Sequence, residues 1–255
     1  MSEQTAIDPR EILNSAGYED VPAVLLPYQQ EWIADKSPLK VAEKSRRIGL
    51  TWAEAADSVL DAASDAGQNC YYLGYNKDMT VEFIQACAMW AKAFNAACGD
   101  VEEGFWEDGD KHIQTYTIRF PKSGRRIEAL TSRPSNLRGR QGRVIFDEFG
   151  FHEKKSELLK AGIALLIWGG CVRVISTHDG EDNEFNDLIK EIRSGKRKGT
   201  VHRTTFREAV EQGLYKRVCL RKKIKYNKAE EQVWVDDTYK FYGDASDEEL
   251  DVIPS

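Results

Sequence analysis

The sequence is poor in the residues that hold small secreted domains or zinc sites together. Its 255 residues include five cysteines and four histidines. The cysteines are odd in number and scattered, without a C-x-x-C pair, which argues against a disulfide framework and against a zinc finger. The histidines are too dispersed to indicate a metal site. We therefore expect reduced cysteines with structural roles.

Long apolar runs are also missing. No uninterrupted apolar stretch reaches the roughly 18 residues that a membrane-spanning helix needs. Residues 1–5 lack the basic and then apolar pattern of a secretion signal, and no G-x-S-x-G motif or internal repeat is present. The 41% hydrophobic content suits one sizeable core. We expect a soluble, intracellular protein without a membrane partner.

Charge is distributed unevenly along the chain. The net charge is −6, yet residues 190–228 carry fourteen Lys and Arg against three Asp and Glu, a local +11 that leaves −17 elsewhere. A basic segment on an acidic body favours weak, salt-sensitive contact with a phosphate backbone. A solvated basic helix and loop explains the same pattern, so the sequence leaves open whether this segment meets DNA or a protein.

Hydrophobic patterns predict an α/β fold with a mainly parallel central sheet. Short apolar or β-branched runs predict strands at residues 39–42, 69–75, 144–146, 171–175 and 200–206. Helical patterns follow at residues 51–63, 78–97 and 207–212. Alternating runs at residues 112–120 and 125–131 flank a turn and predict an antiparallel hairpin, inserted in the sheet or at its edge. The acidic tail, residues 243–251, is expected to be loose.

Polar segments follow three of the predicted strands. A basic loop, residues 44–51 (K-S-R-R-I-G-L-T), follows the first strand, Asp147 and Glu148 end a buried one, and Ser176-Thr177 end the next. The carboxyl ends of parallel strands share one crevice, so these segments should converge. A loop before a helix can bind phosphates through its backbone N–H groups. Asp147 could then support Mg²⁺ and Glu148 orient the attacking water, which predicts ATP hydrolysis.

The basic loop departs from the usual P-loop pattern, G-x-x-x-x-G-K-[ST]. Lys44 takes the first glycine position, Gly49 the second, Leu50 the lysine position and Thr51 that of the metal-binding hydroxyl. Because the usual lysine is missing, we expect Lys44 to swing over the nucleotide toward the β- and γ-phosphates. The two arginines of the loop are the alternatives. A basic turn before a helix is commonplace, so the loop alone is weak evidence.

Further candidates lie outside the loop and the acidic pair. Gln29, just before the first strand, could pair bidentately with an adenine edge. Arg138 and Arg140 lie on a glycine-bearing loop before the acidic strand, where an arginine could neutralise transition-state charge, in cis or in a neighbouring subunit. Ser176 and Thr177 could bond the attacking water or γ-phosphate, or simply form a turn or helix cap.

The order of these segments resembles the ATPase domain of tailed-phage terminase large subunits, particularly those of Mu-like phages. The resemblance rests on a Tyr-Gln before the first strand and on the segments KSRRIGLT, SRPSNLRGR, VIFDEFGFH, VISTHDG and TTFREAVEQGL. It covers roughly residues 25–214. The chain departs from the family at Leu50, which occupies the lysine position, and at His178, where a proline is frequent.

The resemblance implies a P-loop NTPase fold of the ASCE/RecA-like type, with ATP and Mg²⁺ bound. It implies a motor that pumps double-stranded DNA into a procapsid, assembled as a homo-oligomeric ring on the portal protein and working with a small terminase subunit in the host cytoplasm. It assigns adenine contact to Gln29, metal support to Asp147 and catalysis to Glu148. Coupling would fall on Ser176 and Thr177, and a trans-acting role on Arg138. Phosphate binding is assigned to Lys44, Ser45, Arg46, Arg47, Gly49, Leu50 and Thr51, the last also a metal ligand.

We expect three regions: an N-terminal segment (1–24), the ATPase domain (25–215) and a basic, then acidic, segment (216–255) leading toward a nuclease domain that this chain lacks. We therefore expect no nuclease activity, and a monomer in isolation. Two alternatives stay open. A superfamily 2 helicase or translocase normally keeps the lysine before the Ser/Thr and has a second RecA-like domain. A nucleotide-binding assembly protein without turnover would explain Leu50, but would have less use for Glu148.

Overall fold

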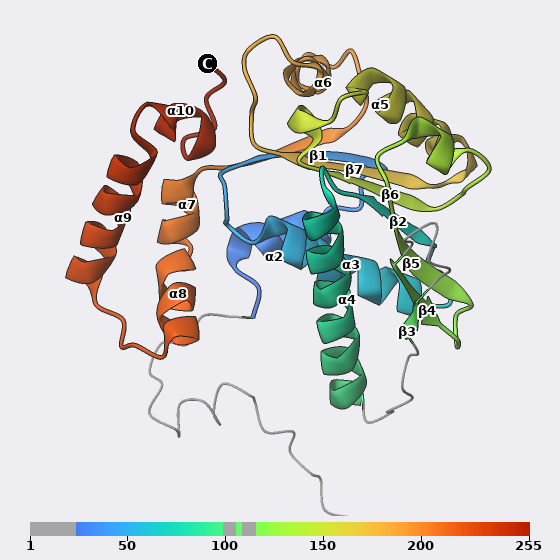
Figure 1. Ribbon diagram of the computed structural model, residues 1–255, viewed down its shortest axis with the longest axis horizontal. Coiled ribbons are helices and arrows are strands. Elements are labelled where there is room, and N and C mark those ends of the chain that lie inside the picture. The colour runs from blue at the N-terminus through green and yellow to red at the C-terminus, as the bar shows by residue number, and fades with distance from the viewer. Residues whose placement is uncertain (1–23, 99–105, 109–115) are drawn as a thin grey trace, which may run out of the picture.

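One mixed sheet lies between two layers of helices (Figure 1). The computed structural model describes residues 24–98, 106–108 and 116–255. The strands are β1 (Leu39–Lys44), β2 (Cys70–Leu73), β3 (Trp106–Asp108), β4 (Tyr116–Phe120), β5 (Arg125–Leu130), β6 (Arg143–Asp147), β7 (Cys171–Ser176) and β8 (Thr200–Thr204). The α-helices are α2 (Pro27–Ala34), α3 (Leu50–Ala63), α4 (Lys77–Cys98), α5 (Lys155–Ala164), α6 (Glu184–Arg193), α7 (Phe206–Glu211), α8 (Leu214–Lys222), α9 (Lys228–Tyr242) and α10 (Ser246–Glu249). Short 3₁₀ turns are η1 (Pro134–Leu137), η2 (Phe149–Phe151), η3 (Leu165–Trp168) and η4 (Gly243–Ala245).

The sheet is mainly parallel, as predicted. Its strand order is β3-β4-β5-β2-β6-β7-β1-β8, and every pairing from β5 to β8 is parallel. The predicted hairpin is β4 and β5, which pair antiparallel with Phe120 opposite Arg125 and lie toward one edge. Residues 112–115, predicted to begin its first strand, lie outside the described residues. Among the described pairings, only those of β3 and β4 are antiparallel.

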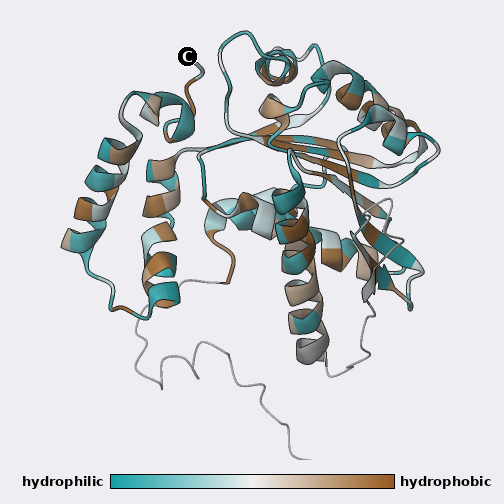
Figure 2. Ribbon diagram, in the orientation of Figure 1, coloured by the Kyte–Doolittle hydropathy of each residue, from teal (hydrophilic) through white to brown (hydrophobic). Residues whose placement is uncertain are grey.

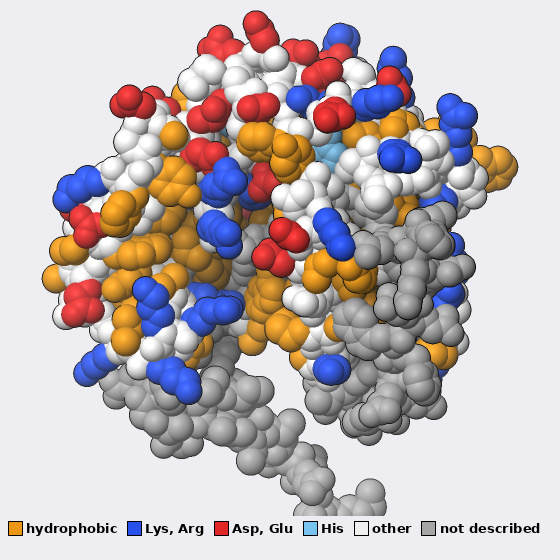
Figure 3. Space-filling model, viewed as in Figure 1, with side chains coloured by type: hydrophobic (Ala, Val, Ile, Leu, Met, Phe, Trp, Pro, Cys, Tyr) orange, Lys and Arg blue, Asp and Glu red, His pale blue; other side chains and the backbone are white. Residues whose placement is uncertain are grey.

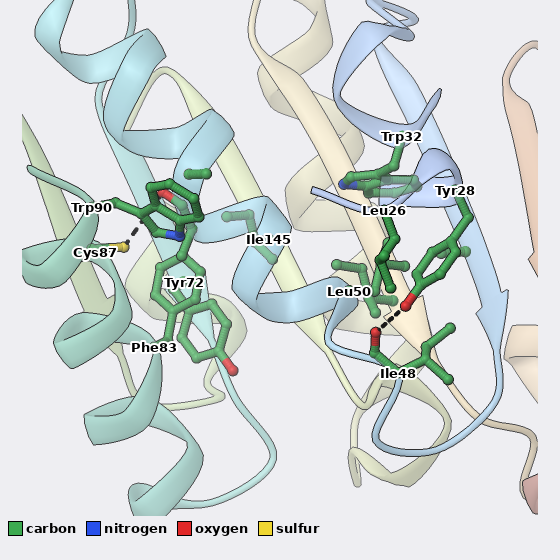
Figure 4. Close-up of a cluster of buried hydrophobic side chains, with 14 of the residues drawn as sticks. Leu26, Tyr28, Trp32, Ile48, Leu50, Tyr72, Phe83, Cys87, Trp90 and Ile145 are labelled. Atoms are coloured by element: carbon green, nitrogen blue, oxygen red, sulfur yellow. Dashed lines mark hydrogen bonds between the residues drawn. The ribbon is translucent and has the colours of Figure 1, made fainter. Parts of the chain in front are cut away.

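The central strands are buried on both faces, which explains their continuous apolar sequences. In β6, Val144 and Phe146 pack toward α5 and α6, whereas Ile145 faces the layer of α2, α3 and α4. Figure 2 shows the matching concentration of hydrophobic residues in these strands. Figure 4 shows part of the hydrophobic cluster between the sheet and helices α2, α3 and α4. In this cluster Tyr72 of β2 stacks on Phe83 of α4 with ring centroids 3.9 Å apart. The sheet is thus held rigidly from both sides.

Two boundaries, at the amino end of the basic loop and after β8, differ from the prediction. β1 continues to Lys44 rather than ending at residue 42, because it stays in register with β8 through Lys44 opposite Thr204. β8 in turn ends at Thr204 rather than at residue 206. Thr205 then caps α7: its hydroxyl accepts the backbone N–H of Glu208, whose carboxylate accepts the N–H of Thr205.

The acidic tail is folded, and the prediction that it is loose is wrong. η4 and α10 lie within residues 243–249, and the segment after them returns to the body of the protein. The backbone N–H of Arg46 donates to the carbonyl of Glu249 at 2.9 Å, and that of Phe206 donates to the carbonyl of Leu250 at 2.8 Å. The predicted domain boundary at residue 215 falls inside α8.

Other expectations concern cysteines and membrane helices. The four cysteines with described side chains, Cys70, Cys87, Cys171 and Cys219, are free thiols, as expected. Among the described residues, no helix has the length and apolar character needed to cross a bilayer.

Candidate functional site

The carboxyl ends of β1, β6 and β7 bring the predicted segments to one edge of the sheet. These strands are neighbours, and their registers set Glu43 of β1 beside Ser176 of β7, and Asp147 of β6 beside Ile175. Glu148, Thr177 and Lys44 therefore lie in this order across the same side of the sheet. The convergence predicted from strand order is present.

The basic loop leads directly into α3. Gly49 is the residue before the helix and has a left-handed backbone conformation, φ 77°, which glycine adopts at little cost. The first N–H groups of the helix have no partners within the helix, which makes this end a natural anion site. Leu50 is 4% exposed and packs in the core. Leu50, which takes the position of the usual lysine, therefore offers only its backbone N–H to a ligand of the loop.

Two consecutive residues of α2 donate hydrogen bonds to backbone carbonyl groups of the loop. Tyr28 donates its hydroxyl hydrogen to the carbonyl of Ile48 at 2.5 Å, a bond drawn in Figure 4. The amide nitrogen of Gln29 donates to the carbonyl of Gly49 at 2.8 Å, and its amide oxygen accepts from the N–H of Leu26 at 2.9 Å. Gln29 is buried, so the residue predicted to contact adenine uses both polar atoms inside the protein.

Asp147 forms the buried centre of the site. One of its oxygens, Oδ2, accepts hydrogen bonds from Thr51 Oγ1 at 2.9 Å and from the Tyr72 hydroxyl at 2.7 Å. Burial, and then the neighbouring charge of Glu148, raise the pKa of Asp147 to about 6. Tyr72 was not predicted as a site residue, since only the pairing of β2 with β6 brings it to Asp147.

Glu148 is held in a strained and charged arrangement. Its backbone is left-handed at φ 50° and ψ 50°, which costs a non-glycine residue about 1–3 kcal/mol. Its carboxylate accepts a hydrogen bond from Lys44 Nζ at 2.9 Å and from the backbone N–H of Thr177 at 3.3 Å. Although burial works in the other direction, the Lys44 ammonium lowers the pKa of Glu148. Lys44 thus meets the carboxylate that the sequence assigns to catalysis.

Ser176 and Thr177 lie in the same crevice but differ in their bonding. Ser176 Oγ accepts the backbone N–H of Gly150 at 3.0 Å, so it connects β7 to the turn after Glu148. Thr177 Oγ1 is buried and has no hydrogen-bond partner within the described part of the chain. A buried hydroxyl without a partner is costly, and a polar ligand in the crevice would satisfy it.

Arg138 lies apart from this crevice. It is exposed on the loop after η1 and lines a cavity of about 470 Å³ with Lys160 and Trp168. Among the described residues, no hydrogen bond or ion pair joins its side chain to Asp147 or Glu148. Arg140, the other predicted arginine, forms two bonds to Glu128 at 2.6 and 2.9 Å and has a structural role.

Two further loop residues, Ser45 and Arg46, contact the folded tail. Arg46 NH1 lies 2.6 Å from a carboxylate oxygen of Glu249, and Ser45 Oγ donates to the Glu249 carbonyl at 3.2 Å. Arg47 is exposed and has a positive φ of 59°. Glu249 was not predicted as a site residue, because its sequence position 203 residues away gives no signal of the contact.

The arrangement suits a magnesium nucleotide. The described residues contain no group of three or more His, Cys, Asp or Glu side chains that could hold a metal ion. A P-loop enzyme needs fewer protein ligands, since Mg²⁺ is bound mainly by phosphate oxygens and water with one hydroxyl and a nearby carboxylate. Thr51 and Asp147 are such a pair, and they are in direct contact.

Sequence comparison gives relatives in phage Mu and in a Mu-like prophage. No family model matches the chain. It is 52% identical to the Mu-like prophage FluMu protein gp28 of Haemophilus influenzae over 218 residues, 84% of this chain and 43% of that protein. It is 48% identical to the probable terminase large subunit gp28 of Escherichia phage Mu over 239 residues, 91% of this chain and 43% of that protein. The chain thus spans less than half the length of these relatives.

Solved structures give the same fold at low identity. The large terminase ATPase domain of Thermus phage P74-26 superposes with a TM-score of 0.64 at 14% identity, covering 96% of this chain and 98% of that one. The large terminase of another thermophilic bacteriophage, in complex with ADP, gives a TM-score of 0.60 at 14% identity, covering 89% of this chain and 53% of that one. The chain is therefore similar in sequence to part of the gp28 proteins of phage Mu and of a Mu-like prophage, and its fold is that of phage large terminase ATPase domains.

Proposed function

We propose that this chain hydrolyses ATP as the motor part of a phage terminase large subunit, driving double-stranded DNA into a procapsid. One observation carries the proposal: a phosphate-type loop, a hydroxyl bonded to a buried aspartate and a second carboxylate paired with a lysine meet at one end of a parallel sheet. The named relative in phage Mu, a probable terminase large subunit, agrees with it.

Thr51 and Asp147 would hold Mg²⁺. When bound, the ion neutralises phosphate charge and orients the γ-phosphate. With a pKa of about 6, Asp147 is mostly ionised at neutral pH, and Tyr72 and Thr51 already orient its oxygen Oδ2. The backbone N–H groups at the start of α3 would bind the phosphates beside it.

Glu148 would act on the attacking water. The water oxygen bonds to the γ-phosphorus while the bond from that phosphorus to the bridging oxygen breaks, giving ADP and phosphate; Glu148 accepts the proton that the water loses. In the structure Lys44 neutralises this carboxylate. The more negative phosphates would draw Lys44 Nζ toward themselves and leave Glu148 free. Nucleotide binding would thereby activate the base.

Ser176 and Thr177 would transmit the state of the nucleotide. Thr177 contacts Glu148 through its N–H, and its hydroxyl is available to a water or phosphate oxygen. Ser176 holds the turn that follows Glu148. A change at the γ-phosphate would therefore shift both the turn and β7.

The proposed motor is a homo-oligomeric ring on the portal protein, supplied with DNA by a small terminase subunit in the host cytoplasm. Arg138 would serve a neighbouring copy; its exposure supports this role, as does the cavity that it lines together with Trp168, which is 82% exposed. Basic residues at the end of α8 and just after it are exposed: Arg221, Lys222, Lys223 and Lys225. They would contact the DNA backbone or a partner subunit, and Figure 3 shows basic side chains over this region. The proposal covers ATP hydrolysis and not DNA cleavage.

A second candidate is nucleotide binding without turnover. Leu50 is part of the core and cannot supply a cation, and Lys44 is engaged with Glu148. If Lys44 stays on Glu148 when ATP binds, the site would bind nucleotide without activating water.

Phosphate release separates these functions. We expect Mg-ATP hydrolysis that rises more than linearly with protein concentration, because a neighbouring copy supplies Arg138, and that responds to double-stranded DNA. Glu148→Gln should lower the hydrolysis rate at least about 100-fold while ATP binding persists. Lys44→Ala should weaken both binding and turnover.

Glu153→Gln is the matched control, since Glu153 is exposed five residues further on; its rate should equal that of the parent. A Glu148→Gln variant that hydrolyses ATP at the parent rate would disprove the assignment of Glu148. Mg-dependent ATP binding without any hydrolysis, even at high concentration with DNA, would favour the binding protein.

A further inference from the structure

Glu43 is a buried carboxylate that the proposed reaction does not use. It directly precedes Lys44 in β1, and it is 3% exposed. Consecutive side chains of a strand point to opposite faces, so Glu43 turns toward α6 while Lys44 turns toward Glu148. Arg193 of α6 forms an ion pair with Glu43, and Arg203 Nε of β8 lies 4.0 Å from it. These cations offset the cost of burying the charge.

The buried ring of His178 lies between Glu43 and Asn186, a residue of α6. Its Nδ1 is 2.5 Å from Oδ1 of Asn186. The other end of the Asn186 amide donates to the carbonyls of Gly180 and Glu181 at 2.7 and 3.0 Å, so Oδ1 accepts and Nδ1 carries the hydrogen. Nε2 lies 3.4 Å from a carboxylate oxygen of Glu43 and forms no hydrogen bond within the described part of the chain. It can donate to Glu43 when it too carries a hydrogen.

Glu43 and His178 are the chain neighbours of the two residues that hold the Glu148 carboxylate. Lys44 follows Glu43 and donates to one oxygen of Glu148 at 2.9 Å. Thr177 precedes His178 and donates through its backbone N–H to the other oxygen of Glu148 at 3.3 Å. The contacts therefore form a closed ring, with Glu148 on one side and the pair of His178 and Glu43 on the other. A change in the distance between that pair should shift both groups that hold Glu148.

We propose that His178 is a positioning residue for Glu148 and that it acts through Glu43. The inference rests on the proposed ATP hydrolysis and adds a residue that is 3% exposed and touches neither nucleotide nor water. A general base must lie within hydrogen-bond reach of the proton that it accepts. When Lys44 moves to the phosphates, the N–H of Thr177 is the bond that still orients Glu148. The contact between His178 and Glu43 keeps Thr177 in place for that step.

Two amide substitutions at His178 separate its two contacts. His178→Gln places an amide nitrogen near the position of Nε2 and can donate to Glu43, whereas His178→Asn places one near Nδ1 and reaches only Asn186. After thermal unfolding has shown that both are folded, kcat and KM for Mg-ATP are measured at one protein concentration with DNA. His178→Gln should keep kcat within about threefold of the parent, His178→Asn should lower it about tenfold, and KM should stay within about twofold in both.

Glu43→Gln gives a second variant that leaves the imidazole in place. It should lower kcat about tenfold at unchanged KM, and adding His178→Asn to it should lower kcat less than about twofold further, because both act along one route. A folded His178→Asn with the parent kcat would overturn the inference, as would a Glu43→Gln with the parent kcat even where His178→Asn does not fold. Either result, with Glu148→Gln inactive, leaves the proposed function intact. A parent that does not hydrolyse ATP would overturn both.

Discussion

Two adjacent carboxylates acquire different properties from their surroundings. Asp147 is fully buried and faces hydroxyl groups, so burial and the charge of Glu148 raise its pKa to about 6. Burial also acts to raise the pKa of Glu148, but the Lys44 ammonium outweighs this and lowers it. The difference suits the proposed roles, because a metal-supporting and a water-activating carboxylate need different environments.

Because the pKa of Asp147 is raised, we predict that ionisation of its carboxyl group lowers the free energy of unfolding. A carboxyl whose pKa is higher in the folded than in the unfolded protein stabilises the fold when protonated, and this contribution is lost as the pH rises from about 4 to about 6. Asp147→Asn cannot ionise. Relative to the parent, we expect its free energy of unfolding to gain up to about 3 kcal/mol between pH 4 and pH 7.

Chemical denaturation across this pH range measures the effect. Asp65→Asn, an exposed position, is the control and should follow the parent at every pH. A pH-independent difference between Asp147→Asn and the parent would show that Asp147 keeps an ordinary pKa.

At the level of helices and strands, the loop is shaped by α2 as much as by its own residues. Tyr28 and Gln29 bind the carbonyls of Ile48 and Gly49, which fixes the backbone of the loop just before α3. Leu50 anchors the start of α3 in the core. The Tyr-Gln pair therefore has a positioning role that the sequence alone did not indicate.

Gly49→Ala should be more damaging than Gly139→Ala. Both glycines have similar positive φ angles, 77° and 73°, so each alanine should cost about 1–2 kcal/mol in backbone strain. A Cβ at Gly49 would also lie 3.1 Å from the Gln29 amide nitrogen, whereas one at Gly139 would meet nothing within 4 Å. Gly49→Ala should therefore lose additional stability and bind ATP more weakly.

Thermal unfolding and ATP titration of the two variants provide the measurement. Equal losses of stability, with unchanged ATP affinity in both, would mean that Gln29 does not restrain the loop.

At the scale of the whole molecule, a buried ionic cluster joins the sheet to helices α2 and α3. Arg143, at the start of β6, binds Asp57 at 2.7 Å and Glu54 at 3.2 Å, both on α3. Glu54 also accepts a hydrogen bond from Trp32 of α2 at 2.6 Å. The cluster lies at the end of β6 opposite Asp147, so it holds the strand that carries Asp147.

Arg143→Met should destabilise the protein by about 3–5 kcal/mol, because it leaves the buried Glu54 without its cation and leaves the buried Asp57 only the exposed Lys36. Arg126→Met should cost less than about 1 kcal/mol, since the Arg126 side chain is 36% exposed and its partner Glu128 keeps Arg140. Urea denaturation compares the two. Similar losses of unfolding free energy in both variants would indicate that the buried cluster contributes no more to stability than the half-exposed ion pair of Arg126.

Local sequence patterns were enough to predict the order of strands and helices and the chemistry at the strand ends. Alternation and apolar runs are local signals, and strands that run parallel bring their carboxyl ends, and with them Lys44, Asp147 and Thr177, to one side of the sheet. The tertiary structure alone determines which side chains come into contact. Tyr72 contacts Asp147, Gln29 contacts the loop, and Glu249 contacts Arg46. These contacts join residues 20 to 203 positions apart, and they depend on strand neighbours and a folded tail that no local pattern specifies.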